Sequence, residues 1–483
     1  MNKTKIVCTI GPRSCNTNTL KRLIANGMSI ARLNGSHNTL EWHRRTIKLI
    51  RTIDENIPIL LDIPGRKIRT KKSDEGFRFS RGQELTITPG KNHATRNKVG
   101  ITYGHLHRDL KAGDTILADD GTLKFRVQSI EGRDVVCRTM TKGVLKGGKG
   151  LNIPFVKVNT PIVTKRDREV IDFAIKNRVD WVGVSFVESA VHVAKIRRLL
   201  GKNNIGIISK IENQYAIDNL DEIIEQSSGL MVDRGDLGAE TCIEGIGMAQ
   251  KDILSRAKEH GKPVIVATEM LHSMIRNPQP TKAEIVDISN SILDGASAIM
   301  LSGETAVGDY PVAAVKTMRA VADEVEKNDS VYNKTNMSLN HASIPNAIGK
   351  SICEICQAMP IDKVVCITLS GYAANMISRY RIKPPILAVT NSREKARLFD
   401  LLWGVEGISL ETPFYSDKYD HIIHVAEMLW KRGTLLDSQT VIFTAVIFPR
   451  KGNKMNFLAI HKIGNLRAVF NWEKTERRIA QYA

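Results

Sequence analysis

The chain has 483 residues, of which 42% are hydrophobic, and it carries 70 Lys and Arg residues against 51 Asp and Glu residues. This length and composition are enough for two or three domains with hydrophobic cores, and no stretch reaches the ~18 unbroken apolar residues of a transmembrane helix. The N-terminal stretch lacks the apolar segment of a secretory signal, so we expect a cytoplasmic protein with no membrane partner.

The formal net charge of +19 suits anionic partners. Nucleic acid is one such partner, but aromatic residues make up only 5% of the chain and the pattern contains no nucleic-acid-binding module. A phosphorylated metabolite fits the same charge. We therefore expect no nucleic-acid partner.

Short apolar runs alternate with helical patterns along most of the chain. Eight of these runs occupy residues 5–10, 29–34, 58–63, 180–186, 205–211, 229–234, 263–268 and 297–303. Each run is almost continuously apolar, as expected of a strand that is buried on both faces. Strands alternating with helices in this number predict a (β/α)8 barrel, with a doubly wound open sheet as the alternative. The count and the polar residues at nearly every strand end favour the barrel.

Two segments depart from this alternation. About a hundred residues separate the third strand from its helix at 165–178, and their short alternating runs between Gly, Asp and Pro turns predict an all-β insert. Beyond a polar, Asn-rich linker near 327–343, the pattern predicts a second α/β unit built on an open sheet. The predicted domains are a barrel formed by 1–69 and 156–335, a β-rich lid at 70–155 and a C-terminal α/β domain at 336–483.

Charged and polar side chains follow the predicted barrel strands, where barrel enzymes carry their chemistry. In the stretch IISKIENQ, residues 207–214, Lys210 and Glu212 lie two apart and therefore point to the same side of a strand. Other strand ends carry Arg32, Asp62, Asp236, Thr268 and Glu304. The carboxylates of Glu212 and Asp236 suit Mg²⁺, which prefers oxygen ligands, and forked guanidinium groups suit an anion.

Each of these residues also has a structural interpretation. A lone Lys-x-Glu at a strand end can be a salt-bridged edge, Asp236 can be a turn residue and Thr268 can cap a helix. Polar groups at almost every strand of one barrel, however, converge on one face. This convergence favours a functional site.

The motifs at these positions resemble those of the pyruvate kinase family. They are TKIVCTIGPRS, ARLNGSH, GRKIRT, GGKGLNIP, SKIEN, MVDRGDLGAE, GKPVIVATEML and IMLSGETAVGDYPVAAV, in the family's order. The resemblance covers essentially the whole chain and implies a barrel, a β-barrel insert after the third strand and a C-terminal α/β domain. It also implies a phosphotransferase that moves a phosphoryl group from phosphoenolpyruvate to ADP in glycolysis, giving pyruvate and ATP, with Mg²⁺ or Mn²⁺ as cofactor.

The resemblance further implies a role for each matching residue. Lys210 stabilises the transferring phosphoryl group, Arg32 holds the phosphate, and Glu212 and Asp236 bind Mg²⁺. Thr268, with the backbone N–H groups of Gly235 and Asp236, binds the substrate carboxylate and takes part in protonation. The implied nucleotide contacts are Asn34, His37, Arg69 and Lys149.

The same resemblance bears on ions, assembly and regulation. Asn34, Ser36 and Asp62 match monovalent-ion ligands, while Lys67 brings an ammonium in place of K⁺, so we expect that K⁺ is not required. A homotetramer is implied. Thr368, Ser370 and Gly371 match a loop for a phosphorylated effector, or else form a plain strand–helix turn. The basic run 449–454 falls near a second effector loop.

Two departures from the family pattern keep other functions open. Gly35 stands where Phe is usual and Asp233 where Ala is usual, and the second adds a carboxylate close to Asp236. A low-activity, phosphoenolpyruvate-binding regulatory paralogue is therefore the alternative function. A metal-dependent barrel lyase is a third, but it would not explain the insert or the basic residues on the nucleotide side.

Overall fold

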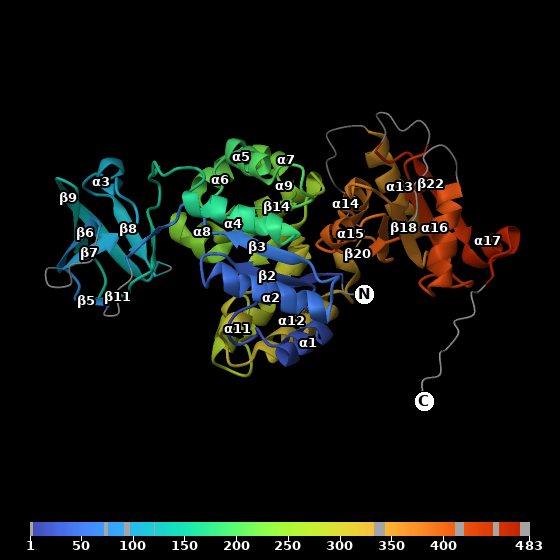
Figure 1. Cartoon of the computed structure of the whole chain (residues 1–483), viewed down its shortest axis with the longest axis horizontal. Helices are drawn as coiled ribbons and strands as arrows, with labels where there is room; N and C mark the ends of the chain where they lie inside the picture. The colour runs from blue at the N-terminus through green and yellow to red at the C-terminus, as the bar shows by residue number, and fades with distance from the viewer. Residues whose placement is uncertain are drawn as a thin grey trace.

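The computed structural model describes residues 3–71, 76–90, 97–119, 121–332, 343–410, 420–447 and 454–473. Three units lie in a row, with the barrel between the β-rich insert and the C-terminal unit (Figure 1). None of the described helices combines the length and the apolar character that crossing a lipid bilayer requires.

The central unit is a closed barrel of eight parallel strands. In their order around the barrel the strands are β1 (Lys5–Thr9), β17 (Ala298–Leu301), β16 (Val264–Ala267), β15 (Gly229–Asp233), β14 (Gly206–Ile211), β13 (Trp181–Val184), β3 (Ile59–Ile63) and β2 (Ile30–Asn34). Every predicted apolar run contains one of these strands. The (β/α)8 barrel is thus confirmed, and the open-sheet alternative is wrong for this part of the chain.

Helices cover the outside of the barrel and bury its main hydrophobic core against the strands. They are α1 (Thr17–Ala25), α2 (Leu40–Ile53), α4 (Lys165–Lys176), α5 (Ala190–Leu200), α6 (Gln214–Asp218), α7 (Leu220–Gln226), α8 (Arg234–Glu240), α9 (Ile246–Glu259), α10 (Lys282–Asp294), α11 (Gly303–Ala306) and α12 (Pro311–Val325). Short 3-10 turns occupy η2 (Ile243–Gly245), η3 (His272–Ile275) and η4 (Asp329–Val331). Capping boxes begin α4 at Thr164 and α10 at Thr281, where a side chain satisfies backbone N–H groups that the helix leaves free.

The insert has its own hydrophobic core around Phe125. Its larger sheet has the order β4 (Ile68–Arg69), β12 (Gly150–Asn152), β8 (Thr115–Ala118), β9 (Leu123–Glu131), β10 (Asp134–Thr139), β6 (Glu84–Pro89) and β7 (Lys98–Ile101). β11 (Gly143–Leu145) pairs with β5 (Phe77–Phe79), and α3 (Leu106–Asp109) is a short helix. The insert is therefore β-rich as predicted.

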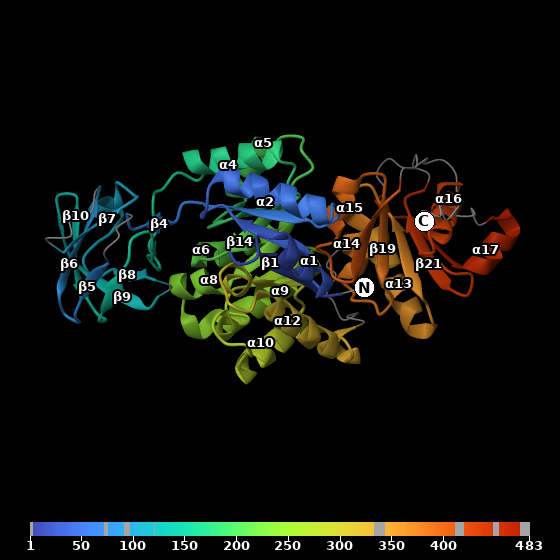
Figure 2. The ribbon, with the colours of Figure 1, turned by 60° about the horizontal axis from the view of Figure 1, so that its bottom comes forward.

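The C-terminal unit is a five-stranded open sheet with the order β20 (Val405–Ser409), β19 (Ile386–Thr390), β18 (Lys363–Ile367), β21 (Thr440–Ala445) and β22 (Phe457–Lys462), the last antiparallel. Its helices are α13 (Ile344–Ala358), α14 (Tyr372–Ser378), α15 (Arg393–Phe399), α16 (Asp420–Lys431) and α17 (Ile463–Phe470). Two separate clusters of buried side chains pack in this unit. In both views α14 and α15 lie toward the barrel and α17 lies farthest from it (Figures 1 and 2).

Candidate active site

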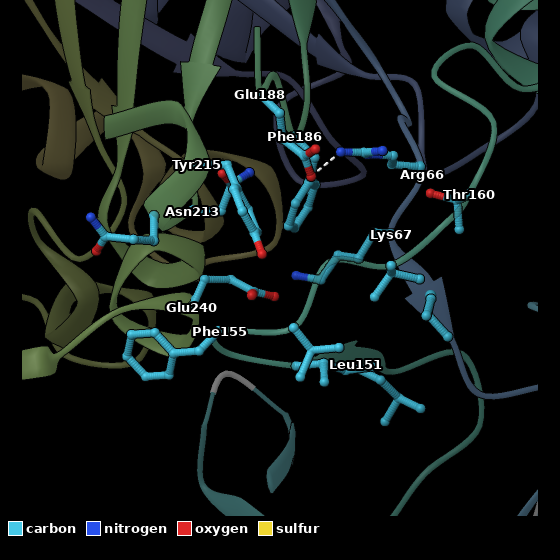
Figure 3. A pocket seen from close by; sticks show the side chains of 15 residues that line it. Arg66, Lys67, Leu151, Phe155, Thr160, Phe186, Glu188, Asn213, Tyr215 and Glu240 are labelled. Atoms are coloured by element: carbon cyan, nitrogen blue, oxygen red, sulfur yellow. Dashed lines mark ion pairs between the residues drawn. The ribbon is translucent and has the colours of Figure 1, made fainter. Parts of the chain in front are cut away.

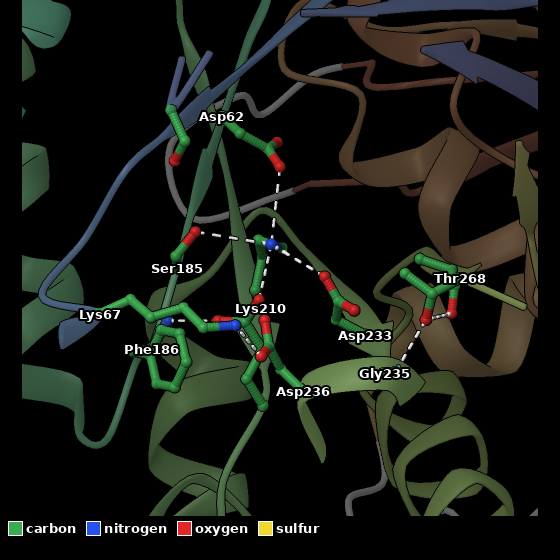
Figure 4. Close-up of polar contacts among 12 residues, drawn as sticks. Asp62, Lys67, Ser185, Phe186, Lys210, Asp233, Gly235, Asp236 and Thr268 are labelled. Carbon is green, nitrogen blue, oxygen red and sulfur yellow. Dashed lines mark hydrogen bonds and ion pairs between the residues drawn. The ribbon is translucent and has the colours of Figure 1, made fainter. Parts of the chain in front are cut away.

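Lys210, near the end of β14, lies among acids at the C-terminal ends of the barrel strands (Figure 4). Its Nζ is 2.6 Å from Glu212 Oε1 and 3.0 Å from Asp233 Oδ2. Asp62 Oδ2 is 3.6 Å from the same nitrogen, and Ser185 Oγ accepts a hydrogen bond from it at 3.5 Å. Burial on its own lowers the pKa of an ammonium, but the carboxylates raise the pKa of Lys210 well above its ordinary value. Lys210 therefore keeps its positive charge.

Three carboxylates meet beside Lys210. Glu212, Asp233 and Asp236 each offer an oxygen, and these oxygens lie within 4.8 Å of one another. Burial raises the pKa of Glu212 to about 8, against the opposing attraction of Lys210. Burial would also raise the pKa of Asp233, but the Lys210 ammonium holds it at about 2. Acids this close repel one another unless a cation lies between them, so the cluster can hold a divalent ion.

Arg32, in the middle of β2, is fixed by side chains of the strands on either side, β1 and β3. Its Nε and Nη2 donate to Asp62 Oδ2 at 3.1 and 2.7 Å, and its Nη1 donates to Thr9 Oγ1 at 2.9 Å. Asp62 thus joins Arg32 to Lys210 through one oxygen. Its other oxygen, Oδ1, is buried and has no hydrogen-bond partner among the described residues. The two cations are held side by side at the rim, where they can face an anion.

Thr268, directly after β16, has a backbone conformation that a β-branched residue rarely adopts, with a φ of 68°. Its hydroxyl accepts a hydrogen bond from Gly235 N at 2.9 Å, at the beginning of α8. Its carbonyl accepts from Nε and Nη2 of Arg234, while Nη1 of Arg234 binds both oxygens of Asp287. Arg234, at the start of α8 and anchored to Asp287 of α10, therefore holds Thr268 in the strained conformation.

Lys67 connects the insert to this acid cluster. Its ammonium pairs with Asp236, and Asn152 of β12 donates to Asp236 at 3.4 Å and to Glu240 at 2.8 Å. Lys67 thus lies against Asp236 and not against Asn34, Ser36 or Asp62, the residues that match monovalent-ion ligands. Both connections of the insert therefore contact the acid cluster.

A small cavity of about 60 Å³ lies beside Lys67 at the junction of insert and barrel (Figure 3). Arg66 pairs with Glu188 on one side of it, and the side chains of Tyr215 and Glu240 approach the Lys67 ammonium from another. Burial raises the pKa of Glu240 to about 7. The cavity has room for only a few water molecules.

Gly65, between β3 and Lys67, allows the chain to turn into the insert. Its φ is 68°, and a Cβ at this position would come within 2.9 Å of the Ser185 carbonyl. The Gly65 N–H donates to Asp167, the same side chain that closes the capping box of α4. A glycine at this point therefore serves both the close approach and the turn.

The residues expected to contact a nucleotide come from two units. Asn34 ends β2 and His37 follows it, and the Asn34 side chain accepts from Ser36 N at 3.0 Å. Burial lowers the pKa of His37, and the charges of Arg69 and Arg32 lower it further. In the insert, Arg69 donates to Gly148 O at 3.2 Å and Lys149 pairs with Asp119 at 2.5 Å.

The residues expected to bind an effector lie in the C-terminal unit, away from the barrel rim. Thr368 Oγ accepts from Gly371 N at 3.0 Å, and Ser370 Oγ accepts from Tyr372 N at 3.4 Å. The hydroxyl groups of the loop therefore already bind its own amides. Residues 449–453 of the basic run and 333–342 of the expected linker lie outside the described residues.

Sequence reasoning missed several contacts of the site. Ser185, Asn152 and Glu240 carried no signal, because single polar residues of these types are common at strand and helix ends. Arg234 stands in the conspicuous stretch VDRGDLG, but nothing in the sequence indicates that it binds the carbonyl of Thr268. The order of the strands around the barrel brings these groups together.

Fold and site together define a (β/α)8-barrel enzyme whose rim presents paired cations beside a cluster of acids. The family model "Pyruvate kinase, barrel domain" matches residues 1–315, and "Pyruvate kinase, alpha/beta domain" matches residues 346–461. The pyruvate kinase of Staphylococcus aureus strain MRSA252 is 40% identical over 476 residues, covering 96% of this chain and 81% of that protein. The enzyme of strain bovine RF122 / ET3-1 matches to the same extent. The chain therefore belongs to the pyruvate kinase family.

Proposed function

We propose that this chain is a Mg²⁺-dependent pyruvate kinase that transfers a phosphoryl group from phosphoenolpyruvate to ADP, giving pyruvate and ATP in glycolysis. The observation that carries the proposal is the position of the Lys210 ammonium, which contacts Asp62 of the Arg32–Asp62 pair on one side and Glu212 of the acid cluster on the other. Phosphoryl transfer is catalysed mainly by positioning and by cations that face the equatorial oxygens. Family membership supports the same function.

The chemistry of the acid cluster fits a magnesium ion. Its donors are all carboxylate oxygens, the ligands that Mg²⁺ prefers, and they lie close enough to share one ion. We assign Glu212 and Asp236 as the metal ligands, with Mn²⁺ as an alternative ion. When bound, the ion supplies positive charge to the phosphate oxygens.

The chain's own residues would orient phosphoenolpyruvate as follows. Arg32 holds the phosphate with its guanidinium, whose orientation Asp62 fixes. Lys210 faces the phosphoryl oxygens and keeps its charge through the transfer. Thr268, with the backbone N–H groups of Gly235 and Asp236, holds the substrate carboxylate and lies beside the carbon that receives a proton.

On the nucleotide side, we assign Asn34 and His37 from the barrel, Arg69 from β4 at the junction of the two units, and Lys149 from the insert. We propose that residues 70–155 act as a lid, with 1–69 and 156–335 as the barrel domain and 336–483 as the C-terminal domain. Closure of the lid would bring the two sets together and exclude water, which competes with ADP for the phosphoryl group. The contacts of Lys67 and Asn152 with Asp236 support a coupling between lid position and the acid cluster.

We also propose that activity does not require K⁺. Lys67 pairs with Asp236, so a cation of the chain itself already lies beside the acid cluster, which supports this expectation. Asn34, Ser36 and Asp62 remain the ligands for a monovalent ion if one binds.

We further propose that the protein is a cytoplasmic homotetramer. A phosphorylated effector would regulate it by binding at Thr368, Ser370 and Gly371.

One assay tests the proposed activity. Purified protein is given phosphoenolpyruvate, ADP and Mg²⁺, with and without K⁺, and pyruvate and ATP are measured. Equal amounts of the two products, formed without K⁺, are the expected result. Binding without turnover would indicate the regulatory paralogue instead, for which the Asp233–Lys210 contact provides a reason, and pyruvate formed without ADP would indicate a lyase.

A further inference from the structure

Asn152 lies on the connection through which the chain returns from the insert to the barrel. It ends β12 and is 1% exposed, and its Nδ2 donates to Glu240 Oε1 at 2.8 Å and to Asp236 Oδ1 at 3.4 Å. Both acids belong to α8 and lie four residues apart, so their side chains are on the same face of that helix. One buried amide thus bridges a proposed metal ligand and a second acid of the barrel.

Glu240 is separate from the carboxylates that can share an ion. Within the described residues, that group consists of Glu212, Asp233 and Asp236. Glu240 instead bonds to the Asn152 side chain and to the backbone of Ile153, the next residue of the same connection. Glu240 therefore anchors the returning chain to α8 and does not offer the ion a ligand.

The Asp236 carboxylate receives donors from both connections of the insert on one oxygen. The Lys67 ammonium, on the connection that enters the insert, contacts Oδ1 (Figure 4). Asn152 Nδ2, on the connection that leaves it, contacts the same atom. In the part of the chain that the structure describes, no hydrogen bond reaches Oδ2 of Asp236. The two connections therefore fix the orientation of the carboxylate and leave one oxygen available for an ion.

The Asn152 amide is unfavourable to bury at this position. Its Oδ1 is buried and accepts no hydrogen bond from the described residues. An unsatisfied buried acceptor destabilises the folded state, so stability alone gives no reason for an amide here. The bridge from Glu240 to Asp236 gives a functional reason.

We propose that Asn152 and Glu240 are positioning residues that couple the insert to the divalent ion. Glu240 anchors the connection that leaves the insert, and Asn152, held by this anchor, orients the Asp236 carboxylate toward the ion. The inference rests on the proposed function, because that function assigns the ion to Asp236. It adds that the affinity for the ion depends on two residues that do not bind it, since hydrogen bonds to a ligating carboxylate fix its orientation.

Calorimetric titration of the full chain with Mn²⁺, without phosphoenolpyruvate or ADP, tests the proposal. We expect Asn152→Ala to weaken Mn²⁺ binding about tenfold or more. Glu240→Ala should weaken it to a similar extent, and the double variant should bind no more weakly than Asn152→Ala, because the two residues act through one another. Glu240→Gln removes the charge but keeps an oxygen that accepts from Asn152, so it should retain most of the affinity.

Two nearby substitutions serve as controls. Asn159→Ala removes an exposed amide that donates to Asp109, and Glu244→Gln removes an exposed acid just beyond α8, so both should bind Mn²⁺ like the wild type.

The outcomes separate the inference from the proposed function. Equal Mn²⁺ affinity of Asn152→Ala and the wild type would overturn the inference and leave the proposed function intact. Equal losses in Glu240→Gln and Glu240→Ala would do the same, because they would show an effect of charge alone. Absence of Mn²⁺ binding in the wild type would overturn the inference together with the proposed metal site. Should Asn152→Ala fail to fold, the two Glu240 variants still decide the question.

Discussion

The carboxylate of Asp233 ends 3.0 Å from the ammonium of Lys210 (Figure 4). It lies at the end of β15, next to the strand that carries Lys210, and is buried with it. Glu212 contacts the same ammonium, and both acids belong to the cluster that can hold a metal ion. Because we assign the ion to Glu212 and Asp236, Asp233 is left as a counterion that reduces the positive charge available to the phosphoryl group.

Replacing Asp233 with Ala should release this charge. We expect kcat of Asp233→Ala to rise about tenfold, because electrostatic stabilisation of the transition state dominates this kind of reaction. Steady-state pyruvate formation measures the change. Asp252→Ala, which removes a half-exposed acid paired with Arg256 on α9, is the control. A fall in kcat would instead make Asp233 a contributor to catalysis.

Lys210→Met should abolish most of the activity. Since the ammonium faces the transferring group, we expect kcat to fall by at least about a thousandfold, with Mn²⁺ affinity largely retained. Metal titration and single-turnover kinetics separate the two effects, and thermal unfolding reports the cost of leaving Glu212 and Asp233 buried without a counterion. Lys251→Met, which removes an exposed lysine paired with Asp294, should leave kcat unchanged. A kcat within tenfold of the wild type would refute the assigned role.

Arg234→Met should impair substrate binding through Thr268. A φ of 68° at a threonine costs about 1–3 kcal/mol, and the guanidinium of Arg234 holds the carbonyl that keeps it there. We expect KM for phosphoenolpyruvate to rise about tenfold or more while Mn²⁺ affinity stays the same, because Thr268 loses the two hydrogen bonds that fix its carbonyl. Arg276→Met, at an exposed arginine paired with Asp309, is the matched control. An unchanged KM would show that Thr268 keeps its position without Arg234.

Much of the fold could be predicted from the sequence for a physical reason. The barrel strands are buried on both faces, so they are almost continuously apolar, and each predicted run contains an observed strand. The pairing of Lys210 with Glu212 followed from the period of two along a strand. These features depend on local pattern alone.

The rest of the site depends on contacts between strands and units. The clamp of Arg234 on Thr268 joins residues that are 34 positions apart, and the contact of Lys67 with Asp236 joins residues 169 positions apart. Single-sequence patterns contain no information on such distances.

His192 gives a prediction on pH that reaches the acid cluster. It is buried on α5, where burial first, and then Arg66 and Lys195, lower its pKa to about 4 against a backbone hydrogen bond to Phe186. Phe186 in turn donates its N–H to Glu212 at 2.6 Å. Phe186 therefore links His192 to Glu212 through one short backbone segment.

The sign of the effect follows from the two pKa values. In the unfolded chain His192 takes up a proton near its ordinary pKa of 6.5, whereas in the folded chain it does so only at about 4. Between these values the unfolded state binds more protons, so the free energy of unfolding falls as the pH falls. From pH 6.5 to pH 5 this group should cost about 2 kcal/mol of stability.

Unfolding curves measured across this range test the prediction. The free energy of unfolding of the wild type should fall by that amount relative to the free energy of unfolding of His192→Gln. His424→Gln, at an exposed histidine of α16, should follow the wild type. Curves for His192→Gln that stay parallel to the wild type would mean that His192 is not kept neutral by the fold.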